Sequence, residues 1–141
     1  MSETTTPPPP AAEFETQPHT RARGRVGEDA ACEFLAAAGY RILERNVSTA
    51  AGEIDVIAAD GDTLCFVEVK ARADDEHGPA IAFVDPRKQR RLARCVALYL
   101  ASREVRDRAV RFDVIGLERE AGAWRCELIR GAFEATASFS V

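Results

Sequence analysis

Histidine and paired cysteine are scarce in this chain of 141 residues, and their scarcity excludes several kinds of site. The two histidines are His19 and His77, and the four cysteines stand about thirty residues apart. No Cys-x-x-Cys or Cys/His pair therefore offers half of a zinc site. Three of the four cysteines lie within apolar patterns, which is typical of buried, reduced thiols. We therefore expect a cytoplasmic protein.

Long apolar runs are also missing, so we expect no membrane span. The amino terminus lacks a basic stretch followed by an apolar one, which argues against a secretory signal. Residues 1–20 hold four consecutive prolines, several threonines and few large apolar side chains. We expect them to form a disordered tail. Residues 21–141 suffice for a single domain with one modest core.

Lysine is rare beside arginine, because Lys70 and Lys88 stand against seventeen arginines. The net charge of −4 excludes a chain that is basic throughout. The charge is nevertheless uneven, since residues 85–111 hold nine basic and three acidic side chains. This local excess is compatible with contact to a polyanion such as nucleic acid.

Hydrophobic periodicity predicts a mixed α/β domain with elements in the order α-β-β-β-α-β-β. Helices are expected over residues 21–38 and 86–102, the second with Asp85 as its N-cap and Pro86 at its first position. The long helical crossover after the third strand predicts that the third and fourth strands are parallel neighbours beside an antiparallel meander. The expected strands are 40–46, 53–59, 63–71, 110–117 and 124–129, and the expected loops include 47–52 and 72–82.

The dipeptide Asp60-Gly61 predicts a two-residue turn between the second and third strands, because a type I′ turn needs positive φ at both positions. Residue 59 would then pair with 62, and residue 57 with 64. One face of this hairpin is predicted to be core, and it holds Ile54, Val56, Ala58, Cys65, Val67 and Val69.

The other face of the hairpin carries three carboxylates and a lysine, namely Glu53, Asp55, Glu68 and Lys70. Asp55 and Glu68 would be diagonal neighbours, close enough to share one ion. Like charges repel there, and a cation with oxygen ligands would remove that cost; Mg²⁺ or Mn²⁺ suits the set better than zinc. Such a cation activates water and stabilises charge on a phosphoryl oxygen. A surface edge on which Lys70 pairs with Glu68 or Glu53 is equally open.

Four arginines form one stripe on the second expected helix, namely Arg87, Arg90, Arg91 and Arg94. No acid stands among them, so they repel one another, and a phosphate backbone would relieve the repulsion. This favours nucleic-acid contact over the alternative, a solvated helix face.

Three further polar residues need an interpretation. Lys88 and Gln89 lie in the first turn of that helix, on the flanks of its apolar face, which aims them at the sheet and at any anion near the helix start. Gln89 is a candidate for positioning water or phosphate, with a hydrogen bond to a strand end as the alternative. Asp113, inside an expected strand, is predicted to be structural.

Five short strings in order along the chain together resemble the YraN family of small bacterial proteins. They are GRVGEDAA from Gly24, GEID from Gly52, FVEVKAR from Phe66, KQRRL from Lys88 and RFDV from Arg111. The family is endonuclease-like and distantly similar to Holliday-junction resolvases. The resemblance, which covers about residue 21 to the carboxyl end, therefore implies a restriction-endonuclease-like α/β fold: a mixed sheet flanked by helices.

The resemblance also implies roles for individual residues. Asp55, followed by Glu68-Val69-Lys70, resembles the D…(D/E)xK signature of these nucleases, which implies Asp55 and Glu68 as metal ligands and Lys70 as the catalytic lysine. Glu28 matches an acid on the first helix of related nucleases, a further ligand, whereas its helical wheel alone favours a solvated glutamate. Glu53 would be an outer ligand or the partner of Lys70.

These inferences predict an endonuclease dependent on Mg²⁺ or Mn²⁺ that hydrolyses phosphodiester bonds of branched or structured DNA. Gln89 would join the active centre, as a glutamine on the following helix does in related nucleases. Two other functions stay open: a nucleic-acid-binding module without catalysis, and a protein-interaction subunit whose hairpin charges are merely paired. By analogy with resolvases, a homodimer is a candidate assembly.

Overall fold

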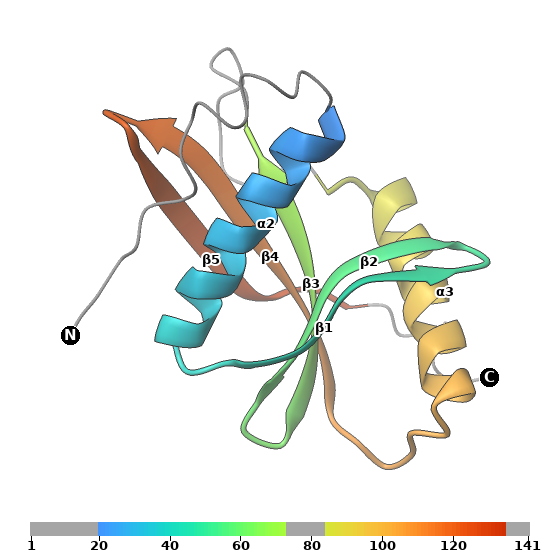
Figure 1. The fold of residues 1–141 in the computed structure, drawn as a ribbon. Coiled ribbons are helices and arrows are strands. Elements are labelled where there is room, and N and C mark those ends of the chain that lie inside the picture. Colours follow the sequence, from blue (N-terminus) through green and yellow to red (C-terminus); the bar gives the residue numbers. More distant parts are fainter. Residues whose placement is uncertain (1–19, 73–83, 135–141) are drawn as a thin grey trace.

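Two helices lie on opposite faces of a five-stranded sheet in the computed structural model, which describes residues 20–72 and 84–134 (Figure 1). The element order is the predicted one, so the α/β class is confirmed. The expected tail, apart from residue 20, and nearly all of the loop expected over 72–82 lie outside the described residues. The elements are α2 (Thr20–Ala37), β1 (Arg41–Thr49), β2 (Gly52–Asp60), β3 (Thr63–Ala71), α3 (Pro86–Ser102), β4 (Val110–Glu120) and β5 (Ala123–Phe133).

The strands lie side by side in their order along the chain. All neighbours are antiparallel except β3 and β4, which are parallel and are joined by the crossover that contains α3. The predicted parallel pair is therefore confirmed. Both edge strands are irregular: the β1 register shifts between Ile42 and Glu44, and the β5 register shifts opposite Phe112 and Val114. Such irregularities discourage further pairing at a sheet edge.

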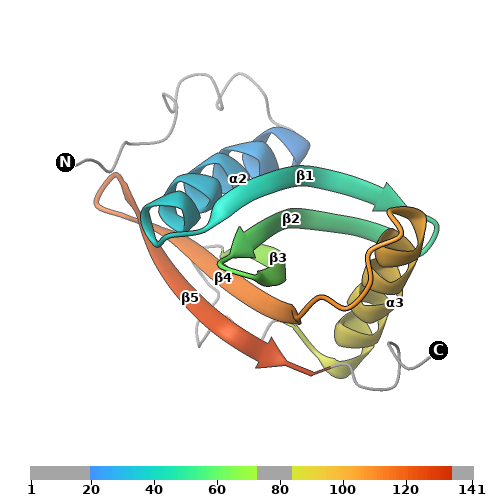
Figure 2. The same ribbon diagram turned by 90° about the horizontal axis from the view of Figure 1, so that it is seen from below.

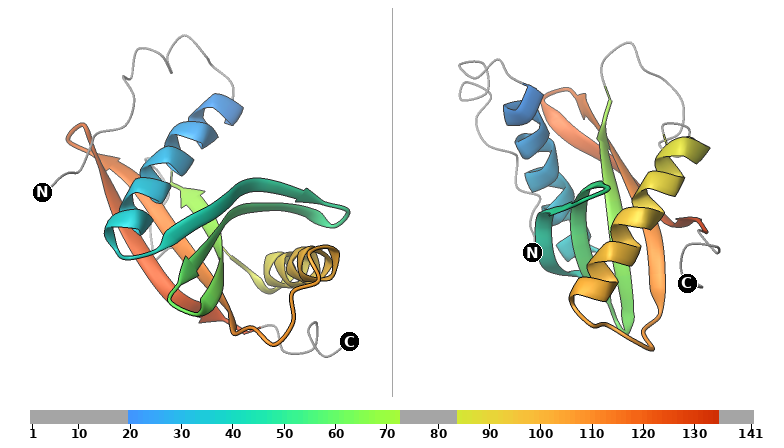
Figure 3. Two further views of the ribbon diagram at one scale, coloured as in Figure 1. Left: turned by 60° about the horizontal axis from the view of Figure 1, so that its bottom comes forward. Right: turned by 90° about the vertical axis from the view of Figure 1, so that its right-hand side faces the viewer.

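Each face of the sheet has its own apolar core, and the right panel of Figure 3 shows the sheet between the two helices. On one face, Leu35 of α2 packs with Val67 of β3 and their neighbours. On the other, Val96 of α3 packs with Phe66 and Ile57. The acid-bearing face of the β2–β3 hairpin is therefore also core over most of its length, and the carboxylates occupy one end of it.

Helix α3 begins as its sequence predicts. Asp85 has extended backbone angles, and its Oδ1 accepts a hydrogen bond from the N–H of Lys88 at 2.9 Å. Pro86 occupies the first position, where the lack of an N–H has no cost. The buried stripe of the helix consists of Leu92, Ala93, Cys95, Val96 and Tyr99.

The loop expected over residues 47–52 is instead the end of a hairpin. Strand β1 continues to Thr49 and pairs with β2, and Val47 lies opposite Ile54 and packs against the α3 core. Figure 2 shows this hairpin curving toward α3. Gly52 closes the turn with a φ of 141°, and a Cβ there would lie 2.6 Å from Nη1 of Arg91. The hairpin therefore rests directly on α3.

The register of β2 and β3 differs by two residues from the predicted one. Asp60 pairs with Thr63, so residues 61–62 form the turn. A shift of two keeps the paired residues on their predicted faces, since side chains alternate with a period of two. It also brings Asp55 level with Glu68, one step beyond the last ladder pair, instead of diagonal to it.

All four cysteines are unpaired thiols, with Cys65 and Cys95 buried and Cys32 and Cys126 half-buried. None of the helices in residues 20–72 and 84–134 is long and apolar enough to cross a membrane.

Candidate active site

Strands β2 and β3 separate at Asp55. Their pairing ends at Val56 and Val67, while β2 continues beside β1 alone. The Asp55 side chain fills the gap, because its Oδ2 accepts a hydrogen bond from the backbone N–H of Val69 at 2.8 Å. Ile54 consequently packs in the α3 core and not, as predicted, on the face of Val56. The divergence thus fixes a carboxylate beside the end of β3.

Four carboxylates lie near the point where β2 and β3 separate, which we call the fork. They are Glu28 of α2, Glu53 and Asp55 of β2, and Glu68 of β3. Burial raises the pKa of Asp55 to about 8, and the negative charge of Glu68 is the next cause. The hydrogen bond from Val69 acts in the opposite direction, while the charges of Glu28 and Glu53 raise the pKa further. Burial and the neighbouring acids therefore favour the protonated form of Asp55 in the absence of a cation.

Glu28 is drawn into this cluster and is not solvated. Its side chain is 14% exposed, and burial raises its pKa, although a hydrogen bond from Asn46 and the charge of Arg45 lower it. Its Oε1 is buried and accepts no hydrogen bond from the described residues; Nη2 of Arg45 is 3.9 Å away. The helical-wheel interpretation is therefore wrong, and a ligand role for Glu28 stays a prediction.

Glu53 and Lys70 lie on either side of the fork. Glu53 is exposed at the start of β2, and its charge reaches both Asp55 and Glu28. Lys70 is half-buried near the end of β3, two residues beyond Glu68 and level with Gly116 of β4. The catalytic role of Lys70 and the outer-ligand role of Glu53 stay predictions.

The first turn of α3 reaches the same site. Nζ of Lys88 lies 3.5 Å from Oε2 of Glu68, as expected for a residue aimed at the sheet. Gln89 is placed differently: its Nε2 donates to the backbone carbonyl of Val84 at 2.9 Å, just ahead of the helix. This contact is close to the alternative interpretation of Gln89, and its catalytic role stays a prediction.

Three arginines of the stripe on α3 are exposed, and the fourth packs against the β1–β2 hairpin. Arg87, Arg90 and Arg94 are exposed, whereas Arg91 is half-buried against Gly52. The basic excess of residues 85–111 is also partly neutralised, since Nη2 of Arg103 lies 2.8 Å from a Glu44 carboxylate oxygen on β1. The exposed positive surface is therefore narrower than the sequence predicts.

A divalent cation at this fork would have at most two carboxylate ligands among the described residues. No group of three or more Asp, Glu, His or Cys side chains within residues 20–72 and 84–134 stands close enough to hold one ion. Mg²⁺ commonly takes one or two carboxylates and completes its shell with water and substrate phosphates. Asp55 and Glu68 would be those two. The charges of Glu28 and Glu53 act on Asp55 as well, and Oε1 of Glu28 accepts no hydrogen bond from the described residues.

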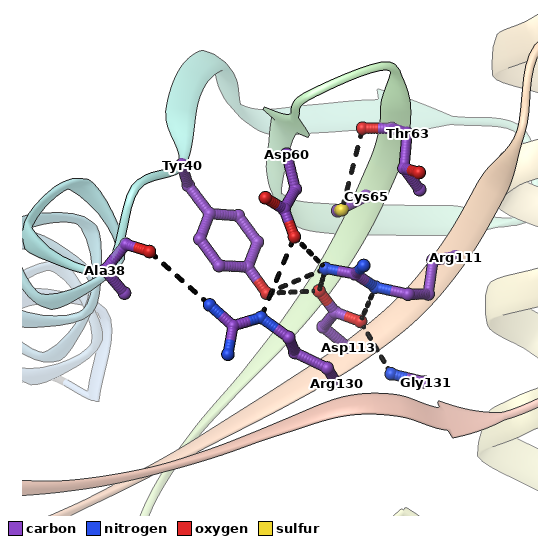
Figure 4. Close-up of polar contacts among 9 residues, drawn as sticks. All are labelled: Ala38, Tyr40, Asp60, Thr63, Cys65, Arg111, Asp113, Arg130 and Gly131. Atoms are coloured by element: carbon purple, nitrogen blue, oxygen red, sulfur yellow. Dashed lines mark hydrogen bonds and ion pairs between the residues drawn. The ribbon is translucent and has the colours of Figure 1, made fainter.

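The opposite end of β3 holds a fully satisfied polar network (Figure 4). Asp113 is completely buried and accepts hydrogen bonds from Tyr40 at 2.6 Å, from Arg111 at 2.9 and 3.0 Å, and from the Gly131 N–H at 2.9 Å. Burial alone would raise the pKa of Asp113, but these donors hold it below its usual value. Arg111 also donates to Asp60 at 2.8 Å. The structural interpretation of Asp113 is confirmed.

The structural role of Arg111 was not predicted, because its position groups it with the basic segment 85–111. The sequence does hold one indication of its pairing with Asp113: the two residues stand two apart in a strand, so they share one face. Its pairing with Asp113 and Asp60 takes it out of the charge available to a polyanion.

Comparison with known proteins places the chain among close relatives. The sequence model of the uncharacterised protein family UPF0102 matches residues 27–117, which include all four carboxylates of the fork. A UPF0102 protein of Symbiobacterium thermophilum is 50% identical over 117 residues, which cover 82% of this chain and 99% of the relative. Another, from Moorella thermoacetica, is 46% identical over 115 residues, covering 80% and 96%.

One solved structure, that of Pyrococcus furiosus SfsA in complex with Ca²⁺, shows a fainter likeness. The alignment is 17% identical with a TM-score of 0.34, and it covers 79% of this chain and 62% of the other. At that score the likeness does not establish a shared fold.

Proposed function

Because the chain belongs to the uncharacterised protein family UPF0102, we propose a function from its own residues: a divalent-cation-dependent endonuclease for branched or otherwise structured DNA. One observation carries the proposal. Asp55 is fixed at the β2–β3 fork by the N–H of Val69, and its half-buried side chain lies close enough to the mostly buried Glu68 for the Glu68 charge to raise its pKa. A divalent cation at the fork would favour the ionised form of both carboxylates, where protonation of Asp55 and the Lys88 ammonium otherwise relieve their repulsion.

Asp55 and Glu68 would hold Mg²⁺ or Mn²⁺ through carboxylate oxygens, which are the ligands these ions prefer. The bound cation would lower the pKa of a water molecule and stabilise negative charge on a phosphoryl oxygen. Glu28 and Glu53 would add negative charge that strengthens the binding of the cation.

Two side chains would handle the reacting atoms. Lys70 follows Glu68 on the same face of β3, and its ammonium would donate to the attacking water or to a phosphate oxygen. One N–H of Gln89 is used by the carbonyl of Val84, which leaves the second N–H and the oxygen to orient a water. The water would attack phosphorus as the bond from phosphorus to the departing sugar oxygen breaks; the water would release a proton to solvent, and the departing oxygen would take one up.

The exposed arginines of α3 supply the contact to DNA. Arg87, Arg90 and Arg94 follow the outer face of the helix, whose first turn reaches Glu68 through Lys88. A DNA strand whose phosphates contact these arginines would run past the first turn of α3, where Lys88 contacts Glu68, and would bring its sugar–phosphate backbone toward the fork. Such contacts position a nucleic acid without reading its bases, and the preference for branched DNA follows from the resemblance to resolvases.

Cleavage of labelled junction, flap, single-stranded and duplex DNA with Mg²⁺ or Mn²⁺ tests the proposal. We expect Asp55→Asn, Glu68→Gln and Lys70→Ala each to lower the rate by about 100-fold or more. Glu120→Gln, on the exposed β4–β5 hairpin, is the matched control and should cleave like the wild type. Full activity in either carboxylate variant would contradict the proposal.

The same assay separates the two alternative functions. Salt-dependent DNA binding without cleavage under any cation would indicate a binding module. Absence of both DNA binding and cation-dependent stabilisation would indicate a protein-interaction subunit.

A further inference from the structure

We propose that Lys88 is a positioning residue that exchanges its ammonium between two anions. With no cation at the fork the ammonium holds the Glu68 carboxylate, and when a divalent cation occupies that carboxylate the ammonium moves to a phosphate of the nucleic acid. This inference rests on the proposed function and assigns a regulating step to the same site.

The first observation is the asymmetric setting of the ion pair. Nζ of Lys88 lies 3.5 Å from Oε2 of Glu68, whose side chain is 11% exposed, while that of Lys88 is 35% exposed. The ammonium thus has a mostly buried carboxylate on one side and solvent on the other. A phosphate approaching from solvent meets the same ammonium without disturbing the sheet.

The second observation is how the residue is anchored. Its backbone N–H donates to Asp85 Oδ1 at 2.9 Å, so the Cα of Lys88 is held at the start of a 17-residue helix. The four-carbon side chain remains free to turn about that point, because lysine carries a compact charge on a flexible stem. No residue of the first turn is acidic, and Arg87 and Arg90 are exposed beside it. The surroundings of the stem therefore favour an anion.

Competition follows from the shared oxygen atoms. An ammonium and a divalent cation repel each other and cannot both stay within contact distance of the Glu68 carboxylate at low cost. The divalent ion has the larger charge and prevails, and the displaced ammonium stays within reach of the site. Cation binding thereby creates a phosphate-binding group, and by linkage phosphate binding favours the cation.

Calorimetric titration of the full chain with Mn²⁺ tests the competition. Removing the competitor in Lys88→Gln should tighten Mn²⁺ binding by about threefold or more. Arg87→Gln is the matched control: it removes the same charge from the same turn, but its side chain is exposed. It should bind Mn²⁺ within about twofold of the wild type. Equal affinities of the two variants would overturn the proposal.

The outcome for the wild type separates the two levels of inference. If the wild type binds no Mn²⁺ that Asp55→Asn and Glu68→Gln abolish, the proposed function fails and the exchange fails with it. If it binds Mn²⁺ in that manner but Lys88→Gln behaves like Arg87→Gln, only the exchange is wrong.

DNA binding, followed by anisotropy of a labelled junction, gives a second readout. In EDTA, Lys88→Gln should bind like the wild type, because the ammonium is engaged by Glu68. With Ca²⁺ as the probe cation it should bind about threefold more weakly, since the phosphate contact is lost. An equal loss in EDTA and Ca²⁺ would show a fixed phosphate contact and overturn the exchange. Thermal melting of both variants confirms that they are folded.

Discussion

Asp55 takes the place of a ladder partner for Val69, accepting its backbone N–H at 2.8 Å where β2 and β3 part. A main-chain donor that a neighbouring strand would ordinarily satisfy is thus satisfied by a carboxylate. The arrangement holds the Asp55 carboxyl group in a half-buried position close to Glu68. The same side chain therefore affects both the stability of the fold and the proposed chemistry.

Asp55→Asn should change how stability depends on pH. The pKa of Asp55 is about 8 in the folded protein against a usual 3.8, so the folded state binds more protons. Ionisation of Asp55 therefore lowers the free energy of unfolding as the pH rises from about 4 to about 8, by at most about 1.4 kcal/mol per unit. An asparagine still accepts from Val69 and removes this cost.

Urea denaturation between pH 5 and 9 measures that effect. We expect Asp55→Asn to be more stable than the wild type at pH 8 by about 2–4 kcal/mol, with the difference shrinking toward pH 5. Saturating Mg²⁺ should stabilise the wild type and not the variant. A variant that is less stable than the wild type at pH 8 would contradict the prediction.

Asp113→Asn should act in the opposite direction. Its carboxylate is completely buried and holds Arg111 and Tyr40, so the substitution leaves the Arg111 charge without its main partner. We expect a loss of about 3–5 kcal/mol in urea denaturation at pH 7. Tyr40→Phe, which removes one donor, should cost about 1–2 kcal/mol.

The pH dependence of that loss has a definite sign. The pKa of Asp113 lies below its usual value, so its stabilising effect is complete above about pH 4 and disappears as the pH falls through the folded pKa. The wild type and Asp113→Asn should therefore converge in stability only in strong acid. A constant difference down to pH 2 would show that the carboxylate charge is not what stabilises the network.

Gly52→Ala should weaken the packing of the β1–β2 hairpin against α3 and lower the stability of the protein. A φ of 141° is strained for any residue with a Cβ, and that Cβ would meet the Arg91 guanidinium. We expect a lower melting temperature, equivalent to about 1–3 kcal/mol. Gly122→Ala, at a φ of 82° with no atom within 4 Å of its Cβ, should cost less. Combining Gly52→Ala with Arg91→Ala should relieve the contact but not the backbone strain.

Salt dependence distinguishes the arginines of α3. Arg90 is exposed, and Arg90→Ala should lower the slope of log affinity for DNA against log salt by about one. Arg91→Ala should change that slope less and destabilise the fold more, because Arg91 lies on Gly52. An anisotropy titration from low to moderate salt measures both. Equal slope changes would place Arg91 in the DNA contact after all.

The element order and the parallel β3–β4 pair could be predicted, because periodicity and the long crossover report them directly. The hairpin register could not, because Asp60-Gly61 is a strong turn signal whereas the turn occupies residues 61–62. The sequence predicts a loop at the end of β1 because Ser48, Thr49 and Ala50 carry no apolar alternation. The extension of the strand depends instead on tertiary packing of Val47 against the α3 core.

The sequence predicted which site residues of the β2–β3 hairpin come together, but not those that other elements contribute. Alternation predicted Asp55 and Glu68 on one face; the structure brings their charges close together, but Asp55 lies beyond the last ladder pair, in the gap between the two strands. The burial of Glu28 depends on how α2 packs on the sheet and on Arg45 of β1, which the helical wheel of α2 does not encode. The loss of Arg91 and Arg111 from the basic surface likewise depends on partners far along the chain, Gly52 and Asp60.

The two polar clusters thus respond oppositely to mutation. Around Asp113 every substitution that removes a partner should destabilise the protein, while at Asp55 a neutral residue should stabilise it. A selection for heat resistance alone would therefore replace acids at the fork first. Under the proposed function, the variants that survive the highest temperatures would be those that have lost catalysis, a stability–activity trade-off confined to the fork.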